Sequence, residues 1–143
     1  MESGSGNPSL QNLVKVAHAL SITLEELLAP PKNECQLIKE KDLPKIKRAK
    51  GEVVIYKLLV SPIPGTEIDK MELAPGSSIK GIPHIEGTKE YFSCFQGRFK
   101  LKVSGKTFYL NKGDVFIFPG DQNHSYINEG TSVAIGFCVV SLS

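Results

Sequence analysis

Hydrophobic and polar residues alternate with a period of two along much of residues 51–143. The clearest case is RFKLKV (98–103), in which Phe99, Leu101 and Val103 alternate with basic side chains. This period places one face of a strand in a core and the other face in water. Turn signals separate this stretch from further predicted strands at EVVIYKLLV, TEIDKMELA, YFSCF, TFYL, VFIF, HSYI and TSVAIGFCVVSL. About eight to ten short strands at this spacing predict an all-β sandwich or small barrel.

A different period governs residues 7–28. Apolar residues recur there at intervals of three and four, which predicts two short helices, each with one apolar face. Asn7 or Ser9 is the N-cap of the first helix, and Thr23 with Glu26 has the spacing of a capping box at the second. Two helices of this length cannot bury their apolar faces on each other alone, so we expect another surface to cover them.

A charged segment, residues 31–50, connects the two parts. From Lys39 to Lys50 it holds six basic and two acidic residues. We expect a solvated linker with one short strand around Gln36–Ile38, although such a segment could also lie near DNA phosphates in a complete protein. The sequence therefore divides into helices at 1–30, a linker at 31–50 and a β domain at 51–143.

Length and composition limit the function classes. A chain of 143 residues with 41% hydrophobic and 22% charged content suits one soluble domain with a small appendage. The formal net charge of +2 is too small to indicate nucleic-acid binding by itself. No apolar run is long enough to span a bilayer, and the N-terminus lacks the features of a signal peptide. We therefore expect a cytoplasmic protein with no membrane partner, whose three scattered Cys residues are reduced.

Four side chains carry the candidate chemistry. His84, Glu86 and Glu90 all have even numbers, so they share one face if the strand runs regularly from 84 to 90. His124 follows after its own turn signal. Two imidazoles and one or two carboxylates that converge from separate strands supply the N and O ligands of Zn, Fe, Mn or Ni.

The same residues also suit a pocket without a metal. In that interpretation His84 and His124 line a small-molecule site as hydrogen-bonding groups. Tyr91, Phe95 and Tyr126 are near in sequence and are candidate walls of the site, although aromatic side chains are commonly core residues first. The residues alone leave both interpretations open.

The spacing of these residues resembles the motifs of the cupin family. The first cupin motif has the form G-x5-H-x-H-x3-4-E-x6-G. His84 stands where its first His belongs, and Glu90 is followed at the right distance by Gly97. Two positions depart from the motif, because Ser78 replaces the opening Gly and Glu86 replaces the second His.

The second cupin motif has the form G-x5-P-x-G-x2-H-x3-N. Gly113, Pro119, His124 and Asn128 all fall at its spacing, and only Asp121 replaces a Gly. Together the two motifs cover residues 78–128. The resemblance implies a jelly-roll β-barrel, the double-stranded β-helix of cupins.

The resemblance also implies a ligand set. The family commonly uses three His and one Glu to hold one divalent metal. In this chain the matching positions are His84, Glu90 and His124, with Glu86 as the candidate fourth ligand.

A second resemblance covers the N-terminal part. Residues 2–28, ESGSGNPSLQNLVKVAHALSITLEELL, resemble the last part of an XRE-type (lambda-repressor-like) helix-turn-helix domain. In that family this stretch follows the recognition helix. The resemblance implies that the first three helices of a five-helix domain are absent from this chain. The alternative is a natural helical hairpin at the N-terminus.

Together the resemblances imply a transcriptional regulator whose cupin domain binds a small-molecule effector, with or without a metal. They also imply a homodimer, which suits a two-fold-symmetric operator, and DNA binding through the absent N-terminal part. In this interpretation no residue is catalytic, and the effector site comprises His84, Glu86, Glu90, Tyr91, Phe95, His124 and Tyr126.

Two alternatives stay open. One is a metal-dependent cupin enzyme, a dioxygenase or isomerase acting on a small acid or thiol. The other is a binding module for sugars or amino acids with no regulatory role. The helical segment and the incomplete His set favour the regulator over the enzyme.

Overall fold

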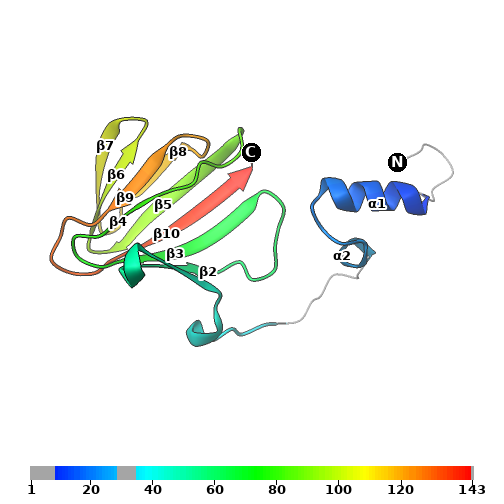
Figure 1. The fold of residues 1–143 in the computed structure, drawn as a ribbon, viewed down its shortest axis with the longest axis horizontal. Helices are drawn as coiled ribbons and strands as arrows, with labels where there is room; N and C mark the ends of the chain where they lie inside the picture. Colours follow the sequence, from blue (N-terminus) through cyan, green and yellow to red (C-terminus); the bar gives the residue numbers. More distant parts are fainter. Residues whose placement is uncertain (1–8, 29–34, 143) are drawn as a thin grey trace. The chain divides into compact units, whose positions relative to one another are not determined.

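A computed structural model describes residues 9–28 and 35–142 of the chain (Figure 1). The chain divides into two compact units, residues 1–37 and residues 38–143. The first unit holds the two helices, and the second holds all the strands that the structure describes.

The first helix, α1 (Leu10–Ala19), begins at one of its two predicted caps. Ser9 is the N-cap, and its side chain accepts a hydrogen bond from the backbone N–H of Asn12 at 3.2 Å. This bond satisfies one of the N–H groups that a helix start leaves without a partner. The other predicted cap, Asn7, lies outside the described residues.

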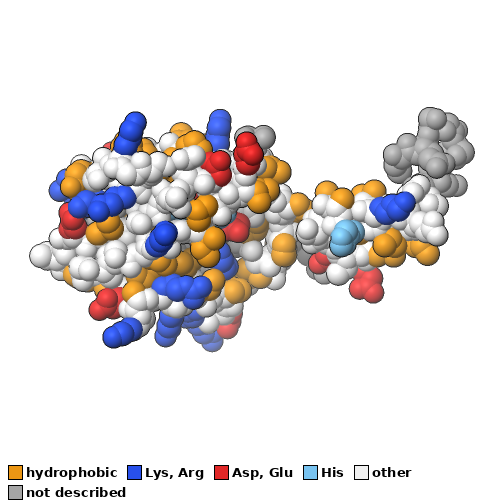
Figure 2. Space-filling view, turned by 45° about the horizontal axis from the view of Figure 1, so that its top comes forward, with side chains coloured by type: hydrophobic (Ala, Val, Ile, Leu, Met, Phe, Trp, Pro, Cys, Tyr) orange, Lys and Arg blue, Asp and Glu red, His pale blue; other side chains and the backbone are white. Residues whose placement is uncertain are grey.

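The second helix, α2 (Leu24–Leu28), has the predicted capping box. The backbone N–H of Glu26 donates to the Thr23 hydroxyl at 3.1 Å, and the backbone N–H of Thr23 donates to the Glu26 carboxylate at 2.7 Å. Figure 2 shows hydrophobic side chains on the surface of this unit, and Leu10 and Leu28 are 65% and 58% exposed. Among the described residues, no helix has the length and apolarity to cross a bilayer.

The second unit is built from ten strands in two antiparallel sheets. The six-stranded sheet has the order β1-β2-β3-β10-β5-β8, and the four-stranded sheet has the order β4-β9-β6-β7. The strands are β1 (Lys45–Arg48), β2 (Val53–Lys57), β3 (Thr66–Leu73), β4 (Ser78–Lys80), β5 (Thr88–Gln96), β6 (Arg98–Val103), β7 (Lys106–Asn111), β8 (Val115–Pro119), β9 (His124–Ile127) and β10 (Ala134–Leu142). This architecture confirms the predicted mainly β fold preceded by two short helices.

The structure corrects the prediction for the connector. No strand forms around Gln36–Ile38, whereas β1 forms at Lys45–Arg48, inside the stretch predicted to be a linker. Ile46 of β1 pairs with Ile55 of β2. The charged composition of β1 hid this strand, because an edge strand needs only one face against the protein and tolerates charges on the other.

The core lies between the inner faces of the two sheets. As predicted, Phe99, Leu101 and Val103 of β6 point inward and are buried. Phe92 of β5 packs edge-to-face on Phe99, with ring centroids 4.8 Å apart. A side chain at Gly136 of β10 would collide with the Phe92 ring, so the close approach of these two strands requires glycine there.

Asn128 fixes the end of β9 to the rest of the barrel. Its side-chain amide is buried and donates to the carbonyl oxygens of Leu73 and Ser132 at 2.9 and 2.8 Å. Its side-chain oxygen accepts from the backbone N–H of Gly130 at 2.9 Å. This strand carries His124, so the turn at Asn128 helps to hold that imidazole in place.

Candidate functional site

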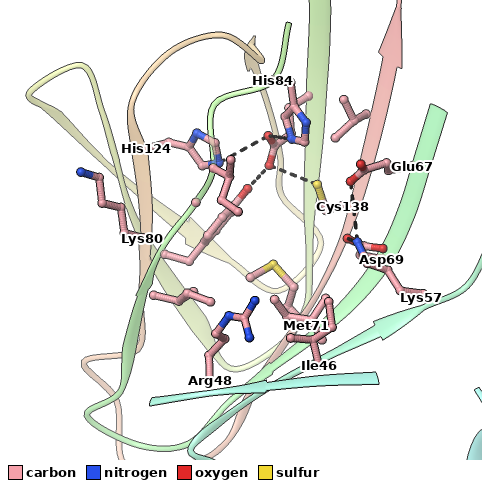
Figure 3. A pocket seen from close by; sticks show the side chains of 17 residues that line it. Ile46, Arg48, Lys57, Glu67, Asp69, Met71, Lys80, His84, His124 and Cys138 are labelled. Carbon is pink, nitrogen blue, oxygen red and sulfur yellow. Dashed lines mark hydrogen bonds and ion pairs between the residues drawn. The ribbon is translucent and has the colours of Figure 1, made fainter. Parts of the chain in front are cut away.

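A pocket of about 330 Å³ opens inside the barrel, and polar groups and apolar side chains line different parts of it (Figure 3). One cluster of polar side chains comes from four places in the chain: β5, β9, β10 and the segment between β4 and β5. Its members are Glu90, His124, Tyr126, Cys138 and His84.

Glu90 is at the centre of the polar part, and its side chain is only 1% exposed. One carboxylate oxygen, Oε1, accepts hydrogen bonds from the Tyr126 hydroxyl and, at 3.1 Å, from the Cys138 thiol. The other oxygen, Oε2, is buried and has no hydrogen-bond partner among the described residues. A buried carboxylate oxygen without a partner costs free energy, so this atom marks the point where the pocket is chemically incomplete.

Two imidazoles face that oxygen. The Nε2 atoms of His84 and His124 each lie 3.6 Å from Glu90 Oε2 (Figure 3). The other ring nitrogen of His124, Nδ1, lies 2.8 Å from the carbonyl oxygen of Gln122. A carbonyl oxygen can only accept, so Nδ1 carries a proton, and in the neutral ring Nε2 presents a lone pair.

If the imidazole is neutral and the carboxylate ionised, His124 Nε2 and Glu90 Oε2 are two acceptors that face each other across 3.6 Å. Such a pair is repulsive unless a proton, a cation or a hydrogen-bond donor lies between the two atoms. The site is thus built to receive a positively charged or donating group at Oε2 and Nε2. A bound metal ion, a donor atom of a ligand, or a proton on either the imidazole or the carboxyl group meets this need.

Backbone contacts hold the two His residues. The N–H of His84 donates to the carbonyl oxygen of Gly120 at 2.8 Å, which fixes the segment that follows β4. The N–H of Gly81 donates to the carbonyl oxygen of His124 at 3.0 Å. A Cβ atom at position 81 would collide with the His124 ring, so glycine lets this segment lie directly against the imidazole.

Burial raises the pKa of the Glu90 carboxyl, and the opposing effects of the Cys138 hydrogen bond and His124 do not cancel it. Burial also raises the pKa of the Cys138 thiol, and the neighbouring Glu90 carboxylate adds to this shift. Cys138 is therefore a protonated thiol that donates to Glu90, and it lacks the thiolate character of a reactive cysteine.

One predicted ligand lies outside the site. Glu86 is exposed in a turn, because β5 begins at Thr88 and the chain does not run as a regular strand from position 84. Gly87 has a φ of 89°, and this left-handed residue breaks the alternation that would have aligned Glu86 with Glu90. The expectation that three even-numbered side chains share one face was therefore wrong for Glu86.

Two predicted pocket walls also lie elsewhere. Tyr91 and Phe95 are on the outer face of β5, where they are 38% and 58% exposed. Alternation along β5 sends Glu90 inward and Tyr91 outward, so adjacent residues cannot both line the pocket. The third aromatic candidate, Tyr126, does line it. The structure thus brings together four of the seven proposed site residues: His84, Glu90, His124 and Tyr126.

Several lining residues were not found from the sequence. Cys138 was predicted only to be one of three reduced cysteines, and its contact with Glu90 depends on the register between β10 and β5. Lys57 of β2 pairs with Asp69 of β3 at 2.8 Å at the edge of the pocket, and Arg48 of β1 also lines it. These residues belong to no recognisable motif, and only the barrel brings their strands together.

The donor chemistry of the site fits a divalent metal. Two imidazole nitrogens and a carboxylate oxygen form a common ligand type for Zn, Fe, Mn or Ni. Ligand atoms that share a tetrahedral ion lie about 3.4 Å apart when the bonds are about 2.1 Å long, and the two His nitrogens lie 3.6 Å from Glu90 Oε2. The arrangement is close to that spacing, but the described side chains do not form a preassembled ion site.

Comparisons with known proteins agree on the barrel. The Cupin_2 model of the cupin domain matches residues 69–140. The HTH-type transcriptional regulator SutR of Escherichia coli K12 is 23% identical over 130 residues, which cover 91% of this chain and 70% of SutR. The similarity extends over most of the chain, so it is not confined to the barrel.

Solved structures show the same fold. The cupin domain of an XRE family transcriptional regulator from Enterobacter cloacae superposes with a TM-score of 0.61 and 22% identity, covering 64% of this chain and 98% of that domain. An HTH_3 family transcriptional regulator from Vibrio cholerae superposes with a TM-score of 0.61 and 23% identity. The match covers 96% of this chain and 74% of that one. A predicted oxalate decarboxylase from Thermotoga maritima superposes with a TM-score of 0.59 and 25% identity. The match covers 76% of this chain and 100% of that one. The barrel is thus similar to proteins described as regulators and to one described as an enzyme.

Because burial raises the pKa of Glu90, substitution of this residue should change the free energy of unfolding in a pH-dependent way. Folding favours the protonated carboxyl, so the destabilising effect of Glu90 is small at pH 4 and grows as the pH rises above its usual pKa of 4.5. We expect Glu90→Gln to raise the free energy of unfolding by about 1 kcal/mol at pH 7.5 and to change it little at pH 4. Urea unfolding in buffer with a chelator measures both values.

The matched control is Glu86→Gln, the same substitution at an exposed position in the preceding turn. It should change the free energy of unfolding by less than about 0.5 kcal/mol at either pH. If Glu90→Gln instead destabilised the protein at pH 7.5, Glu90 would be held as an ion pair with a protonated imidazole.

Proposed function

Because the chain belongs to the cupin family, we propose that its barrel is the effector-binding domain of an XRE-type transcriptional regulator. The match to SutR covers 91% of this chain, and therefore includes more than the barrel. In this proposal α1 and α2 are the last helices of a helix-turn-helix domain, and neither of them is its recognition helix. The protein acts in the cytoplasm, where its DNA is.

The surface of the helices supports this assignment. Apolar side chains of α1 and α2 are exposed, although an isolated pair of short helices gains stability only by burying them. The remaining helices of a DNA-binding domain would cover these side chains. The helices also lack a basic face, because α1 carries Lys15 and His18 whereas α2 carries two acidic residues, Glu25 and Glu26.

One observation supports effector binding above all others. The buried Glu90 Oε2 has no hydrogen-bond partner and faces two imidazoles inside a pocket of about 330 Å³. Apolar walls with a few convergent polar groups are typical of small-molecule sites. An effector or a metal with its effector would complete the interactions of Glu90 and both His residues.

We further propose that His84, His124 and Glu90 hold one divalent metal, Zn, Fe, Mn or Ni. Glu90 Oε2 is suited to ligation because the Tyr126 hydroxyl and the Cys138 thiol already engage Oε1. His124 is suited because its Nδ1–H donates to a carbonyl and leaves Nε2 free. The ion would neutralise the buried carboxylate and offer open positions to an effector. Glu86 has no part in this set.

The metal proposal predicts how variants change affinity. We expect Co²⁺ to bind one per chain, and His84→Ala and His124→Asn each to raise its Kd by about tenfold or more, since each removes a ligand. Calorimetry gives the affinity, and the visible spectrum of bound Co²⁺ reports the coordination. The control is His18→Ala, which removes the remaining His of the chain. His18 is exposed on α1, so this variant should change neither the Co²⁺ affinity nor the visible spectrum. Failure of the wild-type protein to bind would refute a metal site.

A cupin enzyme is the second candidate function. It is favoured by the His and carboxylate donor set and by the fold shared with the predicted oxalate decarboxylase from Thermotoga maritima. A metal ion in this set could polarise a carbonyl or activate dioxygen. Turnover of a small acid or thiol by metal-loaded protein would favour the enzyme, whereas a sensor would bind its effector unchanged.

We also propose that the protein forms a homodimer through the outer face of the six-stranded sheet. Ile117 of β8 pairs with Tyr91 of β5, which in turn pairs with Val139 of β10, so apolar residues form a row across three strands. Beside this row, the Phe95 and Phe137 rings contact each other with centroids 5.8 Å apart. A contiguous apolar face of this kind is typical of a protein interface.

The proposed interface predicts that a charge at its centre disrupts the dimer. Ile117→Glu should shift sedimentation equilibrium toward the monomer, with a dimer Kd raised by about tenfold or more. Ile63→Glu is the matched control, because Ile63 has the same exposure of 54% but lies outside this sheet face. Equal effects of the two variants, or a monomeric wild-type protein, would contradict the proposal.

The assignment also predicts weak DNA binding by this chain alone. The described helices carry too little positive charge to neutralise phosphates, and the recognition helix is not among them. We expect residues 1–143 to enrich no consensus from a random duplex library, whereas SutR serves as the positive comparison. Enrichment of one sequence, bound with a Kd of about 10⁻⁸ M, would refute this prediction.

A further inference from the structure

Arg48 lines the pocket at a distance from the polar cluster around Glu90. It lies on β1, where alternation puts Ile46 and Arg48 on one face, and both line the pocket. Figure 3 shows the Arg48 guanidinium pointing into the pocket from the side opposite His84 and His124. Arg48 is therefore separate from the polar cluster around Glu90, and the other charged lining residues are Lys57, Glu67, Asp69 and Lys80.

The Arg48 guanidinium lacks an acidic partner among the described residues. Its hydrogen bond to the carbonyl oxygen of Lys47, at 3.5 Å, is at the limit of such a bond. By contrast, Lys57 is paired with Asp69 at 2.8 Å and with Glu67 at 3.7 Å on the same pocket rim. A guanidinium offers five N–H donors in a fixed plane, so at this position it can donate hydrogen bonds to both oxygens of a carboxylate.

An apolar stretch separates Arg48 from the polar cluster around Glu90. Ile46, Ile55, Met71, Ile79 and Val140 line the pocket together with the polar groups. Figure 3 shows Met71 and Ile46 beside Arg48. A volume of about 330 Å³ is at the lower end of the range for small-molecule pockets. The walls therefore fit a small ligand with an apolar body.

We propose that the effector is a small organic acid whose carboxylate pairs with Arg48 and whose apolar body lies against Ile46, Ile55 and Met71. This inference rests on the proposed function of the pocket and adds the chemical class of its ligand. Arg48 thus determines specificity, because an unpaired cation favours an anionic head group over a neutral or cationic one. The end of the ligand opposite the carboxylate faces His84, Glu90 and His124.

Three probes with one apolar chain and different head groups test this class: hexanoate, hexanamide and hexylammonium. Each is titrated into the ¹⁵N-labelled chain, and the amide resonances of Met71 and His124 give the Kd. We expect hexanoate to bind more tightly than the other two. Arg48→Gln should raise the Kd of hexanoate by about tenfold, and Arg48→Lys by less, because lysine keeps the charge but loses the planar fork. The Kd of hexanamide should not change in either variant.

Arg98→Gln is the matched control, since Arg98 stacks on Tyr109 with its guanidinium carbon 4.7 Å from the ring centroid, away from this pocket. It should leave the hexanoate Kd unchanged. If hexylammonium or hexanamide bound more tightly than hexanoate, or if Arg48→Gln left the hexanoate Kd unchanged, the inference would be overturned while the pocket remained a small-molecule site. If no probe shifted the pocket resonances, both the inference and the proposed effector pocket would be refuted.

Discussion

The buried carboxylate of Glu90 is the constraint on which the site depends. An ionisable group that is 1% exposed is unfavourable unless its oxygens find partners. The barrel supplies two donors to Oε1, from Tyr126 and Cys138, and leaves Oε2 facing two imidazoles. Since the tautomer of His124 presents a lone pair toward Oε2, the protein alone does not complete this interaction. The proposed site is therefore centred on the one oxygen of this buried carboxylate that has no hydrogen-bond partner among the described residues.

This arrangement exists only because the barrel joins distant strands. Glu90 on β5 pairs with Val140 on β10, which places Cys138 two residues along the same inner face. Tyr126 reaches Glu90 from β9 of the other sheet. The segment after β4 brings His84, and the hydrogen bond from the Gly81 N–H to the His124 carbonyl ties that segment to β9. Each contact is non-local, so the polar cluster forms only in the folded barrel.

The sequence predicted what local rules determine. Alternation along β6 and the capping box at Thr23 were confirmed, because both depend on neighbouring residues. The predictions for His84, Glu90 and His124 rested on motif spacing, and the structure does bring these side chains together. Glu86 was misplaced because the left-handed backbone at Gly87 precedes β5, so the alternation of that strand does not extend back to position 86. The roles of Cys138 and Arg48 could not be predicted, since sheet order and register decide what those residues contact.

The position of Arg48 places the proposed effector against the first strand of the barrel unit. β1 is an edge strand, held to the six-stranded sheet by β2 alone, and it follows directly on the connector that leads from α2. An edge strand with one neighbour is less firmly held than the strands inside the sheet, so a ligand that bridges Arg48 to the inner walls would add stability where the barrel has least. A ligand that binds more tightly when β1 is in place would then shift the equilibrium toward the paired edge strand, because only differential affinity shifts a conformational equilibrium. In the proposed sensor, occupancy would therefore act first on the edge strand and not on the core of the barrel.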